Sequence, residues 1–367
     1  MNNLPLKIVI LGLSVTSSWG NGHATAYRGL MRGLKARGHD VTFLERDTPW
    51  YAAHRDLVGP AYGRVELYID IDNLKDCYLN DIQNADVVMV GSRLQDGAAI
   101  GRWITNTTQG IAVFYDLDTP STISKLENGV IEYLSPELIP QYDLYLSATG
   151  GRVLDRLKSV YGSPQVKTLY PSVDSETYHP KEQEKKWDLG FIGTYDEERK
   201  QLLQNFLQFP AQQWAEGKFV VAGAHYPESA GWPPNVTRIT HVSPSEHCLY
   251  YNALRFELSI ARASVSQAGY SPSVRLFEAA ACATPVISDY WNGLETFFEL
   301  GKEILVASSQ EHVLHYLKKM PEEERLAVGY RARARVGAHH TPARRAAQLE
   351  QYLMELLNNK GRAYVAV

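Results

Sequence analysis

Short apolar runs alternate with helical patterns along the whole of the 367-residue chain. In the first half, strands are expected at 7–11, 41–44, 65–68, 86–90, 111–115, 143–146 and 166–169. Between the first two runs the apolar positions follow one face of a helix, at Ala24, Tyr27, Leu30, Met31 and Leu34, and Gly38 stands at its C-terminal end. Strands that are apolar on both faces and separated by helices predict a doubly wound parallel sheet covered on both sides.

The pattern restarts after residues 174–186, a polar stretch that contains Pro180, ends in a charge run and is expected to be a linker. Beyond it, strands are expected at 188–192, 218–222, 237–242, 256–260, 285–287 and 304–306. The length also suits two domains of roughly 150–200 residues each. We therefore expect an N-terminal domain at 1–173, a C-terminal domain at 187–341 and a last helix from Pro342 to Leu357. Two such sheets predict a cleft between them, with ligands at the carboxyl ends of the strands.

Composition narrows the class of protein only a little. A net charge of −4 gives no general attraction to nucleic acid or to an anionic membrane, although a local basic patch stays open. The three scattered cysteines argue against a disulfide framework and favour a reduced, cytoplasmic compartment. No cysteine or histidine pair stands at metal-ligand spacing, so no metal is expected. The apolar run at 6–12 is too short for a signal peptide, and no segment approaches the roughly 20 apolar residues that span a bilayer.

The stretch with most chemistry is residues 269–288, GYSPSVRLFEAAACATPVIS. It predicts a loop, a helix of small residues, a Thr-Pro break and a buried strand. The loop and the first helical turns carry Ser271, Ser273, Arg275 and Glu278. Hydroxyls and a helix N-terminus suit a phosphate, a guanidinium suits a pyrophosphate, and a carboxylate suits ribose hydroxyls. This list indicates a site for a sugar-nucleotide.

Other polar groups follow strands of the second half. Gly193 and Thr194 are expected to form a turn that a ligand approaches closely, and Arg199 or Lys200 could reach a diphosphate from the next helix. Arg262, just past the 256–260 strand, is a further phosphate candidate. The basic stretch at 331–345 is read as a solvated helix face in preference to an anion-binding strip.

In the first half, the loop after the first strand carries Gly20, Asn21, Gly22 and His23. The glycines and the helix start suit an oxyanion, but the loop is too long for the tight dinucleotide turn and lacks its third glycine. His23 is either a general base, a hydrogen-bond donor to the leaving phosphate, or a capping or packing histidine.

Two carboxylates, Asp116 and Asp118, follow the 111–115 strand and are expected to point to the same side. Asp118 is the better acid/base or acceptor-binding candidate, and a helix N-cap or Asx turn is the alternative. Residues 91–97 form a similar, weaker cluster. Trp50, Tyr51 and their neighbours at 54–55 could line a sugar- or base-stacking surface or pack in the interior.

Residues 278–287, EAAACATPVI, resemble the donor-site signature E-A-x-A-C-G-x-P-V-I of GT-B glycosyltransferases. The whole chain resembles the spore-maturation-protein (CgeB-like) group of that superfamily, through residues 19–25, 45–51, 115–120, 271–278 and 301–305. The resemblance implies two Rossmann-like domains in a GT-B architecture, with the acceptor on the first and the nucleotide-sugar on the second. It also implies that Glu278 holds the ribose, that Ser273, Val274 and Arg275 hold the diphosphate, and that a helix at about 342–358 crosses back to the first domain. Such enzymes work without a bound metal or other cofactor.

The chain departs from the pattern of retaining family-4 relatives at two positions. Tyr270 stands where they carry a glutamate, and Thr194 stands where they carry an arginine, a charge that Arg199 or Lys200 could replace.

The expected function is transfer of a hexosyl or pentosyl group from a nucleotide-diphosphate sugar to an acceptor hydroxyl, and UDP is the candidate nucleotide. His23 or Asp118 would take the acceptor proton if the enzyme inverts, and the departing phosphate could do so if it retains. A sugar-nucleotide epimerase or hydrolase of the same fold and a non-catalytic binding protein are the alternatives. The sequence does not identify the acceptor, which is a saccharide, a protein, a metabolite or a modified nucleic-acid base.

Overall fold

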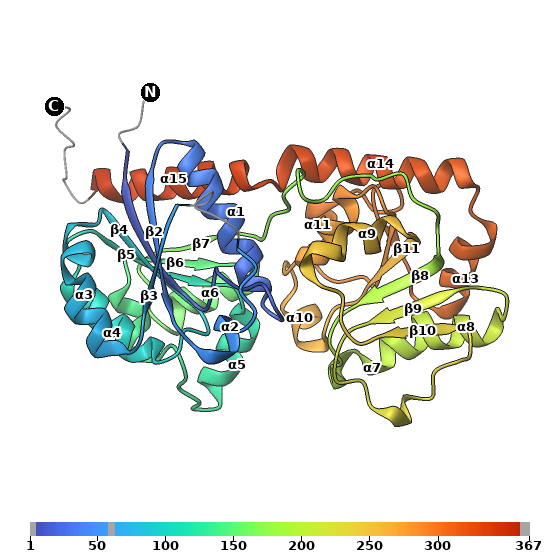
Figure 1. The fold of residues 1–367 in the computed structure, drawn as a ribbon, viewed down its shortest axis with the longest axis horizontal. Helices are drawn as coiled ribbons and strands as arrows, with labels where there is room; N and C mark the ends of the chain where they lie inside the picture. Colours follow the sequence, from blue (N-terminus) through green and yellow to red (C-terminus); the bar gives the residue numbers. More distant parts are fainter. Residues whose placement is uncertain (1–4, 58–62, 360–367) are drawn as a thin grey trace. The chain divides into compact units, whose positions relative to one another are not determined.

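The computed structural model describes residues 5–57 and 63–359, and the chain divides into two compact units. Unit 1 holds the chain up to Ser172 together with the stretch from Pro342 onward, and unit 2 is Val173–Thr341. Each unit is a parallel sheet with helices on both faces (Figure 1). The predicted α/β class with two doubly wound sheets is confirmed.

The sheet of unit 1 has seven strands in the order β3-β2-β1-β4-β5-β6-β7. They are β1 (Lys7–Gly12), β2 (Asp40–Arg46), β3 (Arg64–Tyr68), β4 (Val87–Gly91), β5 (Ile111–Asp116), β6 (Leu144–Ser147) and β7 (Val166–Thr168). Every predicted strand of this half is present, with ends shifted by two residues at most. The strand order reverses between β1 and β4, which is where ligands bind in open sheets of this kind.

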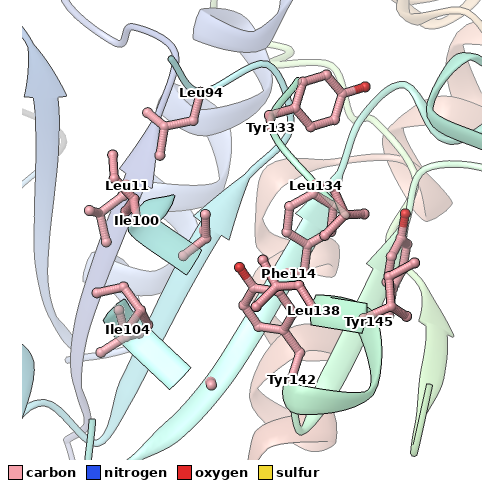
Figure 2. Packing of buried hydrophobic residues seen from close by; sticks show 14 of the residues in the cluster. Leu11, Leu94, Ile100, Ile104, Phe114, Tyr133, Leu134, Leu138, Tyr142 and Tyr145 are labelled. Carbon is pink, nitrogen blue, oxygen red and sulfur yellow. The ribbon is translucent and has the colours of Figure 1, made fainter. Parts of the chain in front are cut away.

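Alternate residues of these strands pack on opposite faces of the sheet, as the pleat requires. One face is covered by α3 (Ile71–Asn84), α4 (Gly97–Thr107), a 3₁₀ turn (Pro136–Gln141) and α6 (Arg152–Ser159). Figure 2 shows this layer, where the ring of Phe114 lies 5.4 Å from that of Tyr142 and 5.2 Å from that of Tyr145 between centroids. α2 (Pro49–Ala52) and α5 (Thr119–Glu127) follow β2 and β5.

The other face of the unit 1 sheet is covered by α1 (Gly22–Ala36) and the C-terminal helix α15 (Pro342–Asn359). The two helices touch closely because α1 carries a glycine at the contact: a Cβ on Gly33 would come within 2.6 Å of the Pro342 carbonyl oxygen and 2.8 Å of Ala346 Cβ. The predicted return of the last helix to the first domain is therefore confirmed.

The sheet of unit 2 has six strands in the order β10-β9-β8-β11-β12-β13. They are β8 (Trp187–Ile192), β9 (Phe219–Ala222), β10 (Val236–Ile239), β11 (Leu254–Ser259), β12 (Val286–Ser288) and β13 (Leu305–Val306). Only the predicted strand at 237–242 is clearly too long, because the chain turns after Ile239 toward a 3₁₀ turn at Pro244–Glu246. The order reverses between β8 and β11, as it does between β1 and β4.

The helices of unit 2 complete the two outer layers. They are α7 (Glu197–Leu203), which continues through a π-helical turn (Gln204–Gln208) into α8 (Phe209–Gln213), then α9 (His247–Asn252), α10 (Ala263–Ala268), α11 (Val274–Ala281), α12 (Leu294–Phe297), α13 (Gln310–Lys319) and α14 (Glu322–His339). No helix of the described residues is both long and apolar enough to cross a membrane.

Two polar segments pack more tightly than their composition suggests. Residues 174–186 contain no helix or strand, but Tyr178 is buried, and Asn252 of α9 donates to His179 O at 3.0 Å and accepts from Lys181 N at 2.8 Å. In the basic stretch, Arg345 is buried and donates to Tyr170 O at 2.8 Å, so this arginine is not part of a solvated face.

Candidate functional site

Three arginines of unit 2 gather at the carboxyl end of its sheet, where the strand order reverses. Arg199 comes from α7, Arg262 follows β11, and Arg275 lies in the first turn of α11. Burial, together with the positive charges of Arg275 and Arg262, lowers the pKa of Arg199 to about 10. Like charges brought together in this way favour an anion among them.

The three guanidinium groups differ in how they are held. Arg199 is 7% exposed and donates from Nη2 to Thr194 O at 2.9 Å. Arg262 forms an ion pair with Asp196, the residue that caps α7. Among the described residues, the Arg275 side chain forms no hydrogen bond or ion pair, so its charge is available to a ligand.

Because Arg275 lies in the first turn of α11, the N-terminus of this helix adds a partial positive charge next to the Arg275 backbone. Ser273 is the N-cap and accepts from Arg275 N at 3.4 Å, and Val274 is the first helical residue. The preceding turn is backbone-strained, since Tyr270 has φ 48° and donates from its amide to Asn292 O at 2.6 Å. Ser271 stands directly after that turn. The predicted diphosphate residues are thus brought to one helix end.

Glu278 lies one turn further along α11 and is 4% exposed. Its Oε2 accepts a hydrogen bond from the Tyr251 hydroxyl at 2.9 Å. A ribose hydroxyl would have to share this carboxylate with Tyr251.

In the loop after β8, the Gly193 carbonyl oxygen accepts from the Tyr226 hydroxyl at 3.0 Å, and the following Thr194 is exposed. That a ligand approaches this loop closely stays a prediction. Of the two basic residues predicted for the diphosphate, only Arg199 joins the cluster. Lys200 is exposed and pairs with Glu197 at 2.9 Å.

Glu257, in the middle of β11, was not predicted from the sequence to be part of the site. It is 1% exposed, neither carboxyl oxygen has a hydrogen-bond partner among the described residues, and burial raises its pKa well above the usual range. The charge of Arg275 opposes that rise. Burial therefore favours the protonated form of this carboxyl group, which is close enough to Arg275 to feel its charge.

In unit 1, the structure joins the two predicted catalytic residues. His23 Nε2 lies 2.8 Å from Asp118 Oδ2, and the two side chains are 12% and 21% exposed. Arg93, after β4, binds the same carboxylate through Nε at 2.8 Å and Nη2 at 3.2 Å. The loops after three neighbouring strands, β1, β4 and β5, thus supply one His–Asp–Arg cluster.

The two carboxylates after β5 have different environments. Burial raises the pKa of Asp116 to about 6, although it accepts from the Tyr145 hydroxyl at 2.6 Å and Thr122 Oγ1 at 2.9 Å. Burial also acts to raise the pKa of Asp118, but hydrogen bonds and charge from His23 and Arg93 hold that pKa well below its usual range. Asp118 is therefore an ionised partner for His23 at neutral pH.

The structure shows how the first turns of α1 and α5 are capped. Asn21 caps α1 by accepting from His23 N at 3.1 Å, so His23 is not the cap. Asp118 stands at the N-cap position of α5, but its side chain makes no capping hydrogen bond. His23 Nδ1 is buried and has no hydrogen-bond partner among the described residues, and Nε2 is held by Asp118, so an incoming acceptor reaches a ring nitrogen only after a local movement.

A buried carboxylate fixes the loop that carries His23. Glu45, at the end of β2, is fully buried and accepts from Ser14 Oγ at 2.8 Å, Val15 N at 2.7 Å, Thr16 N at 2.9 Å and Thr16 Oγ1 at 2.6 Å. Further along the same loop, Gly20 has φ 60° and Gly22 begins α1, both with open space where a Cβ would stand. The described residues contain no group of three or more His, Cys, Asp or Glu that could hold a metal.

Residues 199–351 match the family model described as glycosyl transferase-like. The match includes all three arginines and Glu278, and no curated protein matches the chain.

Solved structures resemble the chain over nearly its full length. A sucrose-phosphate synthase from Thermosynechococcus elongatus is 15% identical, with a TM-score of 0.69 and coverage of 96% of this chain and 100% of the other. HepE from Anabaena, in complex with UDP-glucose, is 11% identical, with a TM-score of 0.71 over 95% and 100% of the two chains. An alpha-glucosyltransferase in complex with UDP and a 13-mer DNA is 14% identical, with a TM-score of 0.71 over 96% and 100%. The fold is GT-B, as predicted, whereas membership of the CgeB-like group stays a prediction.

Proposed function

We propose that the protein is a glycosyltransferase that moves a hexosyl or pentosyl group from a nucleotide-diphosphate sugar to an acceptor hydroxyl. The observation that carries the proposal is the arginine cluster of unit 2, where Arg275 has an uncommitted charge at the N-terminus of α11. UDP is the first nucleotide to test, because structures of the same fold hold UDP or UDP-glucose.

The cluster suits the hardest part of such a reaction, which is the negative charge that develops on the departing diphosphate. Fixed positive groups in a partly buried site stabilise that charge without having to reorganise. Arg275 and Arg199 would face the phosphates, with the amide groups at Ser273–Arg275 as further donors. Arg262 would contribute if the ligand displaces its partner Asp196.

Glu278 would accept from the ribose hydroxyls with the oxygen that Tyr251 does not use. Its burial makes this a selective contact, since a buried carboxylate left without a donor costs free energy. Gly193 and Thr194 would lie against the donor through the turn after β8.

For the acceptor proton, we propose His23, with Asp118 as the carboxylate that stabilises the imidazolium and Arg93 as the residue that keeps Asp118 ionised. Because Nε2 is held by Asp118 and Nδ1 is buried in this structure, the proposal includes a movement that exposes Nδ1 to the acceptor while Nε2 keeps its contact with Asp118. Asn21 and the glycines beside it would allow that movement at the start of α1.

The donor site is tested by titrating the wild-type protein with UDP and a panel of UDP-sugars in isothermal calorimetry. Arg275→Ala is expected to weaken binding about 10–100-fold, since a hydrogen bond to a charged group contributes about 1.5–3 kcal/mol. Lys200→Ala is the matched control, because this lysine is exposed and pairs with Glu197 outside the cluster. Equal binding by wild type and Arg275→Ala would refute the assignment.

The reaction is tested by product analysis after incubation with the donor that binds. Transfer requires a glycosylated acceptor as well as the free nucleotide. Release of nucleotide and free sugar alone, or conversion into an isomeric sugar, would identify the hydrolase or epimerase alternative. Binding without any turnover across a broad acceptor panel would indicate a binding protein.

A further inference from the structure

Three aromatic side chains of unit 1 form a stack that the proposed function does not use. The rings of Trp19 and His54 lie 4.8 Å apart between centroids at an interplanar angle of 20°. The ring of Trp50 lies 5.1 Å from that of His54 and is tilted against it, at an interplanar angle of 44°. Trp19 comes from the loop after β1, and Trp50 from α2 (Figure 1).

This aromatic stack, Trp19–His54–Trp50, lies at the edge of the interior, since Trp19 and His54 are partly buried and Trp50 is exposed. None of its members belongs to the two hydrophobic clusters of the described part of unit 1, and α2 has no buried residue. The Trp50 side chain is 59% exposed. An indole is the largest apolar side chain, so leaving it in water gives up the stabilisation that its burial would bring.

The stack is nonetheless held firmly. Ser17 Oγ donates to His54 O at 2.8 Å, and Asp56 N donates to Thr16 O at 3.0 Å. His54 Nδ1 lies 2.8 Å from Trp50 O. These contacts join residues 54–56 to residues 16–17 of the loop after β1. Glu45 holds the same loop, which leads to His23, so one loop positions both the stack and the proposed base. A pre-organised surface costs less entropy when a ligand binds.

The charges around the stack point to a neutral ligand. Its arginines are each paired with a carboxylate: Arg28 with Asp56, Arg55 with Asp47. Proteins that stack nucleic-acid bases combine their aromatic rings with an excess of positive charge for the phosphates. The described residues around the stack provide no such excess of positive charge. Instead, the partly exposed carboxylates of Asp47 and Asp56 can accept from hydroxyl groups.

We propose that the Trp19–His54–Trp50 stack is the docking surface of the acceptor and that this acceptor is a neutral saccharide. The ring face of a pyranose is lined by C–H groups that carry a slight positive charge, and they pack on the negative face of an indole. The hydroxyls at the rim of the sugar then reach the surrounding carboxylates. The assignment of this ligand as an acceptor rests on the proposed function, whereas saccharide binding itself does not.

Binding is therefore measured without donor, using a panel of neutral α- and β-linked di- to tetrasaccharides and following tryptophan fluorescence or saturation-transfer NMR. Wild type is expected to bind at least one of them, and Trp50→Ala to weaken that binding about tenfold or more. Trp50→Ala is expected to fold normally because Trp50 is mostly exposed. Tyr330→Ala, at a residue that is 55% exposed in unit 2, is the matched control and is expected to bind as wild type.

The proposal is overturned if no saccharide binds, if Trp50→Ala binds as well as wild type, or if a 13-mer oligonucleotide binds through Trp50 in their place. With an active donor, Trp50→Ala is expected to raise the KM for the saccharide, whereas Tyr330→Ala is expected to leave this KM as in wild type. Saccharide binding without nucleotide-sugar binding would refute the proposed function and leave the binding surface in place.

Discussion

Replacing Asp116 by asparagine is expected to stabilise the protein, and by more at high pH than at low pH. The carboxyl is fully buried, and its pKa is about 6 in the folded state against 3.8 for an ordinary aspartate. Because the folded-state pKa is the higher one, the unfolded chain loses its proton first as the pH rises. The free energy of unfolding therefore falls as the pH rises from 3.8 to about 6, and it stays at the lower value at higher pH.

The magnitude follows from that difference. A change from 3.8 to about 6 corresponds to about 3 kcal/mol, and roughly half of it, about 1.5 kcal/mol, develops between pH 5 and pH 8. Asparagine keeps an acceptor for Thr122 Oγ1 and a polar contact for the Tyr145 hydroxyl, but carries no charge. The difference in free energy of unfolding between Asp116→Asn and wild type should thus grow by about 1.5 kcal/mol in favour of the variant from pH 5 to pH 8.

The assay is urea unfolding at pH 5, 6, 7 and 8, followed by circular dichroism and tryptophan fluorescence. Asp76→Asn, at an exposed position of α3, is the control and is expected to give the same small difference at each pH. A stability difference for Asp116→Asn that is constant with pH, or that shrinks as the pH rises, would refute the reasoning.

Three further predictions concern other parts of the molecule. Gly33→Leu is expected to destabilise the protein by about 1–3 kcal/mol in thermal unfolding by forcing α15 off α1, whereas Gly337→Ala, with open space around it, is expected to be neutral or slightly stabilising. Arg93→Met is expected to raise the pKa of Asp118 in carboxyl NMR titrations and, once a donor and acceptor are known, to move the acidic limb of activity to higher pH; an unchanged pKa would contradict the proposed role. Glu45→Ala is expected to lower stability by about 3 kcal/mol or more and to speed amide hydrogen exchange at residues 14–16, because it removes the acceptor of four hydrogen bonds; exchange at the wild-type rate would count against it.

The strands of both sheets were predictable because the sequence pattern that specifies each strand lies within and directly beside that strand. Buried strands of a doubly wound sheet are short apolar runs, and each run stands beside its own turn residues. The ends were less certain where a polar residue is tolerated in a strand, as at the end of β10. The link between His23 and Asp118 was only implied, since the sequence places the two side chains on loops after different strands without giving the distance between them.

The environments of single carboxylates could not be predicted, because they depend on residues far away in the chain. Asp116 and Asp118 look alike in the sequence, and they differ because Tyr145 and Thr122 enclose the first while Arg93 reaches the second. Arg93 itself follows a strand that neighbours both β1 and β5, which was the signal that could have found it. Glu257 gave no signal, since a single glutamate in an apolar run is also typical of an edge or a half-exposed strand.

The return of α15 to unit 1 has a consequence for biosynthesis. The chain leaves unit 1 after Ser172, completes all of unit 2, and comes back only at Pro342. Until the ribosome has made that last helix, the apolar face of the first sheet that Leu349, Leu353 and Leu357 cover stays bare. A nascent chain halted before this point should therefore recruit chaperones or aggregate, and the first unit to emerge should be the last to mature.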